Sequence, residues 1–484
     1  MRNGMWRSAL VASGLILALS ACGGDDEEQT PGGNTGGTGG SGATGGAGGT
    51  GGGSDGGTGG GTGGTGGSST GGTGGGGSTG CPNHPNVTTG SNGECRIGAA
   101  ISAPMTQDIT LDAGNIWYLD GPLVVGDDST KTVLTIQAGT TVFGGDGSFI
   151  LIQRGSQIMA EGTKDAPIVL TSAKAVGSRG PEDWGGLVIN GRAPINNAAN
   201  ADGSAPGEAG TGKYGGNVPD DNSGVLKYVR VEFAGNKIDL ENELNGIAFQ
   251  GVGSGTTVDF IQTHMTSDDG VEFFGGTVNV KHVVVTGSDD DSIDWTGGWT
   301  GKAQFVVAKQ HPDSGTEAER GIEADNLKGT NSATPYSNPT LANVTLIARD
   351  GNAKQGMILR EGTKGHIHNV IVTGWNGYCV TVDHDQTNAN VDDGSLVVAN
   401  GVFHCGSGAA EAGSKAADLL AKDAKNKTAD PMLGGASGWM PGAGSPAIGI
   451  GAGPTDAFFT PADYAGAFDG TTDWTEGWIE TATK

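Results

Sequence analysis

A short motif recurs along the middle of the chain and constrains its fold more than any other feature. The first apolar position of each copy is flanked by polar or small residues, and the copies are Asn245–Phe249, Asp269–Phe273, Asp291–Trp295, Arg320–Ala324, Gln355–Leu359 and Asn376–Val380. The first three copies start 24 and 22 residues apart. Alternation with a period of two is typical of half-buried strands. Short strands that return at this spacing indicate a solenoid, in which each coil buries its inner face against its neighbours.

A second motif, at Asn279–Val283, Asn343–Leu346 and Asn369–Val372, precedes copies of the first at a fixed phase. A propeller needs longer repeats and a jelly roll needs none. We therefore predict an all-β chain that forms a right-handed parallel β-helix over residues 115–484. Only the segment 409–424 is rich in Ala, Leu and Lys, and it predicts one short helix near the C-terminus.

The N-terminal part of the chain is built differently. Residues 1–21 carry two Arg before a short apolar run, which is typical of a secretory signal. The sequence Leu19-Ser20-Ala21-Cys22 is similar to the lipobox of bacterial lipoproteins, which implies cleavage before Cys22 and lipidation of that residue. Residues 22–80 begin with acidic side chains and continue as a Gly/Thr/Ser tract, which predicts a flexible tether. Residues 81–114 form a leading segment before the repeats.

Charge and export limit the possible partners. The chain has 53 acidic and 27 basic side chains, a net charge of −26, which excludes nucleic acid as a partner. We expect contact with the membrane through the lipid anchor, display at the cell surface on the outer membrane, and a monomer. A cation or a polysaccharide or other surface polymer is the expected ligand.

The cysteines other than Cys22 are an even set of four in an exported chain, which favours disulfides. Proximity in sequence predicts the pairs Cys81–Cys95 and Cys379–Cys405. The separation of 26 residues in the second pair equals that of Val344 and Val370, so its members could lie one coil apart.

Acidic residues recur in step with the first motif. If the repeat is real, Asp290 stacks on Asp268 and Asp294 on Glu272, with Glu323 at the margin and Asp269 and Asp291 alongside. Like charges at this spacing repel unless a proton, a cation or a basic side chain is shared. A solvated turn region, a Ca²⁺ site and a catalytic site are all compatible with the pattern.

Several segments resemble known families. The coils are similar to those of right-handed β-helix proteins on bacterial surfaces and to a family of uncharacterised outer-surface lipoproteins; the segments that carry this are 134–143, 150–163, 166–171, 183–190, 321–326, 463–468 and 474–478. The resemblance implies fold and location rather than an activity.

A second resemblance implies catalysis. Asp269, the pair Asp289 and Asp290, and His311 are spaced like the active-site residues of polygalacturonase-like hydrolases. A calcium-assisted lyase would need a base near the acids, for which Arg320 or Lys309 are the nearby candidates.

Aromatic side chains flank the acidic residues. Phe273 and Trp295 fall on the inward phase and are expected in the core, whereas Trp184, Phe274 and Trp299 are expected to face a ligand. The sequence predicts a glycan-binding or polymer-binding surface protein, calcium-dependent and without turnover. The alternatives are a polysaccharide lyase or hydrolase and a structural envelope protein.

Overall fold

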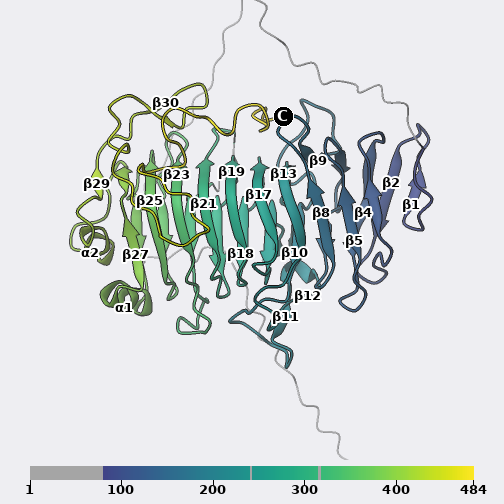
Figure 1. Ribbon diagram of the computed structural model, residues 1–484, viewed down its shortest axis with the longest axis horizontal. Helices are drawn as coiled ribbons and strands as arrows, with labels where there is room; N and C mark the ends of the chain where they lie inside the picture. Colours follow the sequence, from purple (N-terminus) through teal and green to yellow (C-terminus); the bar gives the residue numbers. More distant parts are fainter. Residues whose placement is uncertain (1–79, 240–241, 314–317) are drawn as a thin grey trace, which may run out of the picture. The chain divides into compact units, whose positions relative to one another are not determined.

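The computed structural model describes residues 80–239, 242–313 and 318–484. The signal segment, Cys22 and the tether up to residue 79 lie outside these ranges. The described chain winds into a parallel β-helix, as the repeat predicted (Figure 1). Within the described ranges, no helix is long and apolar enough to cross a membrane.

One ladder of the solenoid contains the first sequence motif. Its strands pair in parallel, each with the strand of the next coil, and are β7 (Ile150–Ile152), β10 (Leu187–Asn190), β16 (Ile247–Gln250), β18 (Val271–Phe274), β20 (Ile293–Thr296), β22 (Ile322–Ala324), β24 (Met357–Leu359) and β26 (Val380–Val382). Their inward residues stack through the core and are buried: Ile247, Val271, Ile293, Ile322, Met357 and Val380. The spacing of the sequence motif therefore corresponds to one coil.

Two more ladders share long strands that bend in the middle. These strands are β13 (Gly224–Glu232), β17 (Thr257–His264), β19 (Asn279–Thr286), β21 (Lys302–Lys309), β23 (Thr340–Ile347) and β25 (Gly365–Thr373). At both ends of the stack the two halves are separate strands: β5 (Val133–Ile136), β6 (Thr141–Gly144), β8 (Gln157–Glu161), β9 (Ile168–Ser172), β27 (Leu396–Ala399) and β28 (Val402–His404).

The bends fall at equivalent residues of successive coils, all with positive φ: Tyr228, Phe260, His282, Phe305, Asn343 and Asn369. This conformation is unfavourable for bulky side chains and tolerable for Asn. The aromatic rings at these bends stack on one another. The ring centroids of Tyr228 and Phe260 are 4.4 Å apart, and those of Phe260 and His282 are 4.1 Å apart.

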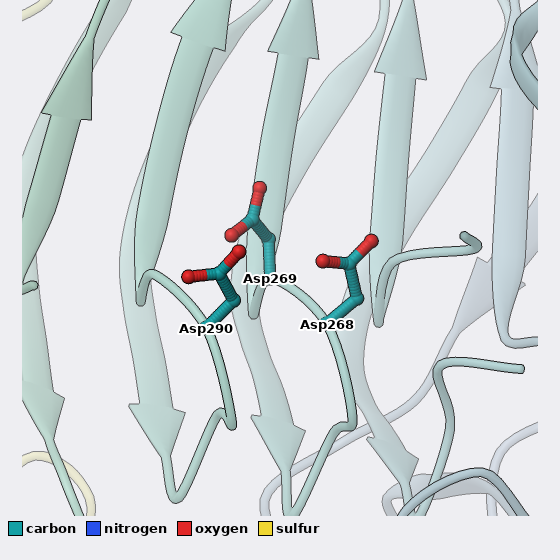
Figure 2. A group of neighbouring side chains, drawn as sticks. All are labelled: Asp268, Asp269 and Asp290. Carbon is teal, nitrogen blue, oxygen red and sulfur yellow. The ribbon is translucent and has the colours of Figure 1, made fainter. Parts of the chain in front are cut away.

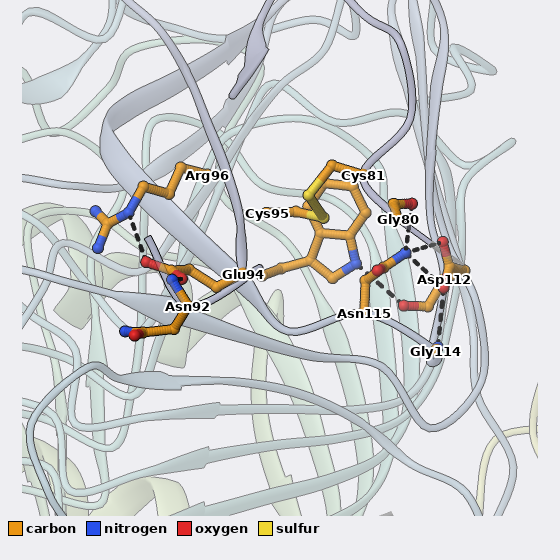
Figure 3. Close-up of a disulfide and its surroundings, with 10 residues drawn as sticks. Gly80, Cys81, Asn92, Glu94, Cys95, Arg96, Asp112, Gly114 and Asn115 are labelled. Carbon is orange, nitrogen blue, oxygen red and sulfur yellow. Dashed lines mark hydrogen bonds and ion pairs between the residues drawn. A yellow bond between two sulfur atoms is a disulfide. The ribbon is translucent and has the colours of Figure 1, made fainter. Parts of the chain in front are cut away.

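The stack of coils begins before residue 115. β1 (Val87–Thr89) pairs antiparallel with β2 (Cys95–Ala99), which pairs in parallel with β4 (Trp117–Val125), and β3 (Ile109–Leu111) pairs with β5. The Cys81–Cys95 disulfide closes this end beside the Glu94–Arg96 ion pair and the hydrogen bonds between Asp112 and Asn115 (Figure 3).

Both predicted disulfides are confirmed. Cys81–Cys95 and Cys379–Cys405 each have a Cα–Cα distance of 5.4 Å. The second bond links two turns at the C-terminal end of the stack, and the Cys379 side chain is buried there.

The helix prediction was incomplete. The expected helix is present but shorter, as α2 (Lys415–Ala421), and the Ser414 side chain caps it. A second helix, α1 (Asp385–Asp393), was not predicted because its residues have low helix propensity. Tertiary contacts fix α1: Asn390 Nδ2 donates to the backbone oxygens of Gly362 and Thr363 at 2.9 and 3.0 Å.

One short strand, β29 (Lys427–Thr428), pairs in parallel with β28 and so extends its ladder. The other short elements lie outside the three ladders. They are β11 (Ser204–Pro206), η1 (Glu208–Gly210), β12 (Lys213–Gly215), β14 (Lys237–Asp239), β15 (Asn242–Glu243), β30 (Leu433–Gly434) and β31 (Met440–Pro441).

The C-terminal strap, residues 450–482, runs back along the outside of the bent strands (Figure 1). Asn400 Nδ2 donates to the oxygen of Ile450 near its start, and Gln262 exchanges two hydrogen bonds with Glu480 near its end. Trp478 is buried against Tyr228, with the rings at 90°. The strap therefore covers coils that are more than 200 residues earlier in the sequence.

Trp478→Ala should lower the free energy of unfolding by about 3–5 kcal/mol, because it removes a buried aromatic side chain. Hydrogen exchange should increase in β13 and β17. The exposed Glu476→Ala serves as the control and should leave both unchanged. Equal exchange in β13 for Trp478→Ala and the wild type would contradict this role of the strap.

Candidate functional site

The acidic residues of two adjacent coils lie close together, in the turns before β18 and β20 and on these two strands. We call Asp268, Asp269, Glu272, Asp290, Asp291 and Asp294 the acidic grid. Register confirms the predicted stacking, since Glu272 pairs with Asp294. Glu323 follows Asp294 on the next coil.

Carboxylates of the grid converge in two groups. One oxygen from each of Asp268, Asp269 and Asp290 lies within 4.8 Å of the others, and Figure 2 shows the three side chains extending to the same side of two neighbouring coils. Asp269, Glu272 and Asp294 form a second group within the same distance. Asp269 belongs to both groups, so the grid is continuous.

Backbone contacts hold the centre of the grid in place. Asp269 Oδ1 accepts the N–H of Asp291 at 3.0 Å, and Asp291 Oδ1 accepts the N–H of Arg320 at 2.6 Å. Each acid thus anchors the start of the next coil. Gly270 is required beside Asp269, since a Cβ at Gly270 would lie 2.4 Å from the Val285 side chain.

An insertion contributes a further acid that the repeat did not predict. Asn245 Nδ2 donates to Glu272 Oε2 at 2.6 Å and lies 3.4 Å from Glu208 Oε2. Glu208 comes from η1, in a segment without repeat motifs, so no signal in the sequence placed it here. It brings one more carboxyl group to the grid.

Burial and mutual repulsion disfavour the charged forms of these acids. Burial, followed by the charges of Asp294 and Asp268, raises the pKa of Asp269 well above its usual range. Burial, followed by the charge of Glu208, does the same to the pKa of Glu272. Burial also raises the pKa values of Asp291 and Asp294. The grid therefore favours any proton or cation that shares its charge.

The next coils carry acids together with bases. Arg320 Nη1 lies 2.6 Å from Glu319 and 3.0 Å from Glu323, and Arg360 pairs with Glu323 and Asp325. Burial raises the pKa of Asp325 to about 7. Glu323, predicted at the margin of the site, is thus neutralised within the protein.

The prediction of ligand-facing aromatic rings was wrong. Trp184 is fully buried, and its Nε1 donates to the backbone oxygen of Glu232 at 2.8 Å. Trp299 stacks on Phe273 in the core at 3.9 Å between ring centroids. Phe274 does leave the coil on the outer side, but Tyr214 of the insertion covers it. Phe273 and Trp295 are in the core, as predicted.

The residues predicted for catalysis are only partly assembled. Asp269 and Asp290 share one group of carboxylates, and Asp289 lies next to it in sequence. His311 follows the end of β21, where its Nδ1 accepts the N–H of Asp313 at 3.1 Å. The catalytic roles of Asp269, Asp289, Asp290 and His311 stay predictions.

The geometry of the grid suits a divalent cation. Ca²⁺ binds oxygen at about 2.3–2.6 Å, so ligands on opposite sides of the ion are about 5 Å apart. Asp294 Oδ1 is buried and has no hydrogen-bond partner among the described residues. It is an acceptor that a cation at this place could use.

Comparison with known proteins identifies one relationship. A family model described as a pectate-lyase like beta helix domain matches residues 103–442, more than half of the chain. Comparison with curated proteins and with solved structures finds no match.

The raised pKa values predict how stability depends on pH. The folded state keeps protons that the unfolded acids release above about pH 4, their usual pKa. The grid's contribution to stability is therefore complete below that pH and is lost as pH rises toward the folded-state pKa values, by about 1.4 kcal/mol per pH unit for each retained proton. Calcium-free protein with Asp269→Asn should gain stability over the wild type between pH 5.5 and 8, and the gain should grow with pH.

This expectation is tested by measuring the denaturation midpoint at several pH values, with a chelator present to keep the protein free of calcium. Taking the difference from the wild type removes the effect of His264, whose pKa burial lowers to about 4. The exposed Asp165→Asn is the control and should show no such trend. A gain for Asp269→Asn that is flat with pH would contradict the raised pKa values.

Proposed function

Because the chain belongs to the family of pectate-lyase-like β-helix domains, we propose that it binds a polysaccharide at the acidic grid, through a divalent cation such as Ca²⁺ and without turnover. The observation that carries the proposal is the convergence of carboxylates around Asp269. The cation neutralises the grid and offers coordination positions to the sugar.

A comparison of neighbouring coils supports the cation. In the coils of β22 and β24, Arg320 and Arg360 neutralise the stacked acids. In the coils of β18 and β20, residues 268–280 and 282–301 contain neither Lys nor Arg. A cation from solution would supply, in the coils of β18 and β20, the positive charge that arginine supplies in the coils of β22 and β24.

The burial of the ligands supports binding from one side. Asp269 and Glu272 are buried, whereas Asp268, Asp290 and Asp294 are half-buried. An ion held by the buried carboxylates would be reached from solvent past the half-buried ones. Ca²⁺ takes six to eight oxygen ligands, so hydroxyl or carboxylate oxygens of a polysaccharide can complete its coordination.

Cleavage of the polymer is the second candidate function. Asp269 and Asp290 lie together, as the resemblance to polygalacturonase-like hydrolases requires. Of the two candidate bases for a lyase, Arg320 already contacts Glu319, Glu323 and Asp291. This engagement argues against Arg320 as the base of a lyase.

The location of the protein is also part of the proposal. Lipidation at Cys22 would attach the chain to the outer membrane, and the tether of residues 22–80 would hold the β-helix away from the bilayer. The β-helix would then meet polymers at the cell surface.

A panel of neutral and acidic polysaccharides tests binding against turnover. We expect at least one polymer to retain the protein in millimolar Ca²⁺ and to release it in chelator, with no new reducing or unsaturated ends. New chain ends would establish the enzyme instead. No retention by any polymer, with or without Ca²⁺, would leave a structural envelope protein.

Calcium should raise the melting temperature of the wild type, because an ion that binds only the folded state stabilises it by RT ln(1 + [L]/Kd), about 2.7 kcal/mol at 100 times Kd. Asp290→Asn combined with Asp294→Asn should abolish this response and, by relieving repulsion, leave the calcium-free protein no less stable. Asp165→Asn, outside the grid, should keep the response. A response that survives in the double variant would exclude the grid as the site.

A further inference from the structure

Two histidines lie side by side on a different ladder from the acidic grid. His366 and His368 are two residues apart on β25, so both side chains leave the same outer face of the strand. Their ring centroids are 6.3 Å apart, and the ring planes are parallel within 4°. Both residues are half-buried, with Ile367 between them in the core.

The ring nitrogens of this pair are available for a ligand. Among the residues that the structure describes, neither imidazole has a hydrogen bond or an ion pair. Burial lowers the pKa of His366, and burial followed by the neighbouring imidazole lowers the pKa of His368. Burial thus disfavours the charged imidazolium, and neutral imidazole is the form in which histidine binds metals.

We propose that His366 and His368 chelate one transition-metal ion of borderline softness, such as Cu²⁺, Ni²⁺ or Zn²⁺. Metal–nitrogen bonds of about 2.0–2.1 Å place the centroids of two adjacent imidazoles on one ion about 4.5–5 Å apart. The observed 6.3 Å between parallel rings is wider than this, so both rings must turn toward each other about their side-chain bonds to complete the site.

The strand neighbours of the two histidines carry no imidazole, thiol or carboxylate group. The rows above and below the histidines are Thr340 and Ala342 on β23 and Val397 and Ala399 on β27. Asp423 is the charged group that acts on His368. Its Oδ1 and Oδ2 accept the backbone N–H groups of Lys425 and Asn400, so it contributes charge rather than a ligand.

The ion chosen here differs from the one proposed for the acidic grid. Carboxylate oxygens suit Ca²⁺, whereas imidazole nitrogens suit Cu²⁺, Ni²⁺ and Zn²⁺. The two sites can therefore be titrated separately, and neither depends on the other.

Titration of the full chain with Cu²⁺ in millimolar Ca²⁺ tests the proposal, since Ca²⁺ occupies the carboxylates. The wild type should bind one tight Cu²⁺, and electron paramagnetic resonance should report two nitrogen ligands. His366→Gln or His368→Gln should weaken binding by about 100-fold, because each removes the chelate. His404→Gln changes an exposed histidine of β28 and should leave the affinity and spectrum unchanged.

The circular dichroism spectrum and the metal-free melting temperature of each variant report that the protein remains folded. Wild-type Cu²⁺ affinity in both His366→Gln and His368→Gln would overturn the proposal. A spectrum with oxygen ligands only would overturn it as well.

Discussion

The hydrogen-bonded stacking of one coil on the next is the interaction on which the rest of the structure depends. A single coil cannot bury Val271 or Ile293, because each inward side chain is covered by the equivalent residue of the adjacent coils. The same register that closes the core also fixes the outer face. The residue that follows each inward side chain points outward, and the equivalent residue of the next coil lies beside it, one strand spacing away.

This coupling explains why the acidic grid is held together. Glu272 faces Asp294 because Val271 stacks on Ile293, and their repulsion is tolerated because the core and the ladder fix both strands. The following coils relieve the same problem with Arg320 and Arg360. Coils that stack in the same register thus differ in how their charge is balanced, and that difference singles out the two coils of the grid.

The sequence predicted the fold, the disulfides and the stacking of the acids, because each follows from the repeat or from simple proximity. It did not predict Glu208, which enters from an insertion, or α1, whose weak propensity is overridden by contacts of Asn390. The sequence also failed to predict that the Trp299 side chain points into the core. Alternation with a period of two applies only within strands, and Trp299 follows the end of β20. Side chains outside the repeated strands depend on three-dimensional contacts that no local pattern encodes.

The C-terminal strap determines when the fold can be completed. Residues 478–482, which follow all the coils in the sequence, contact Arg230, Gln262 and His264. These earlier coils must therefore form without this support until the strap has been added. Once the strap is in place, the last coils of the stack are linked to the coils of β13 and β17 in its middle. A linear array that would otherwise fray from its C-terminal end is thereby held as one cooperative unit from its middle to that end.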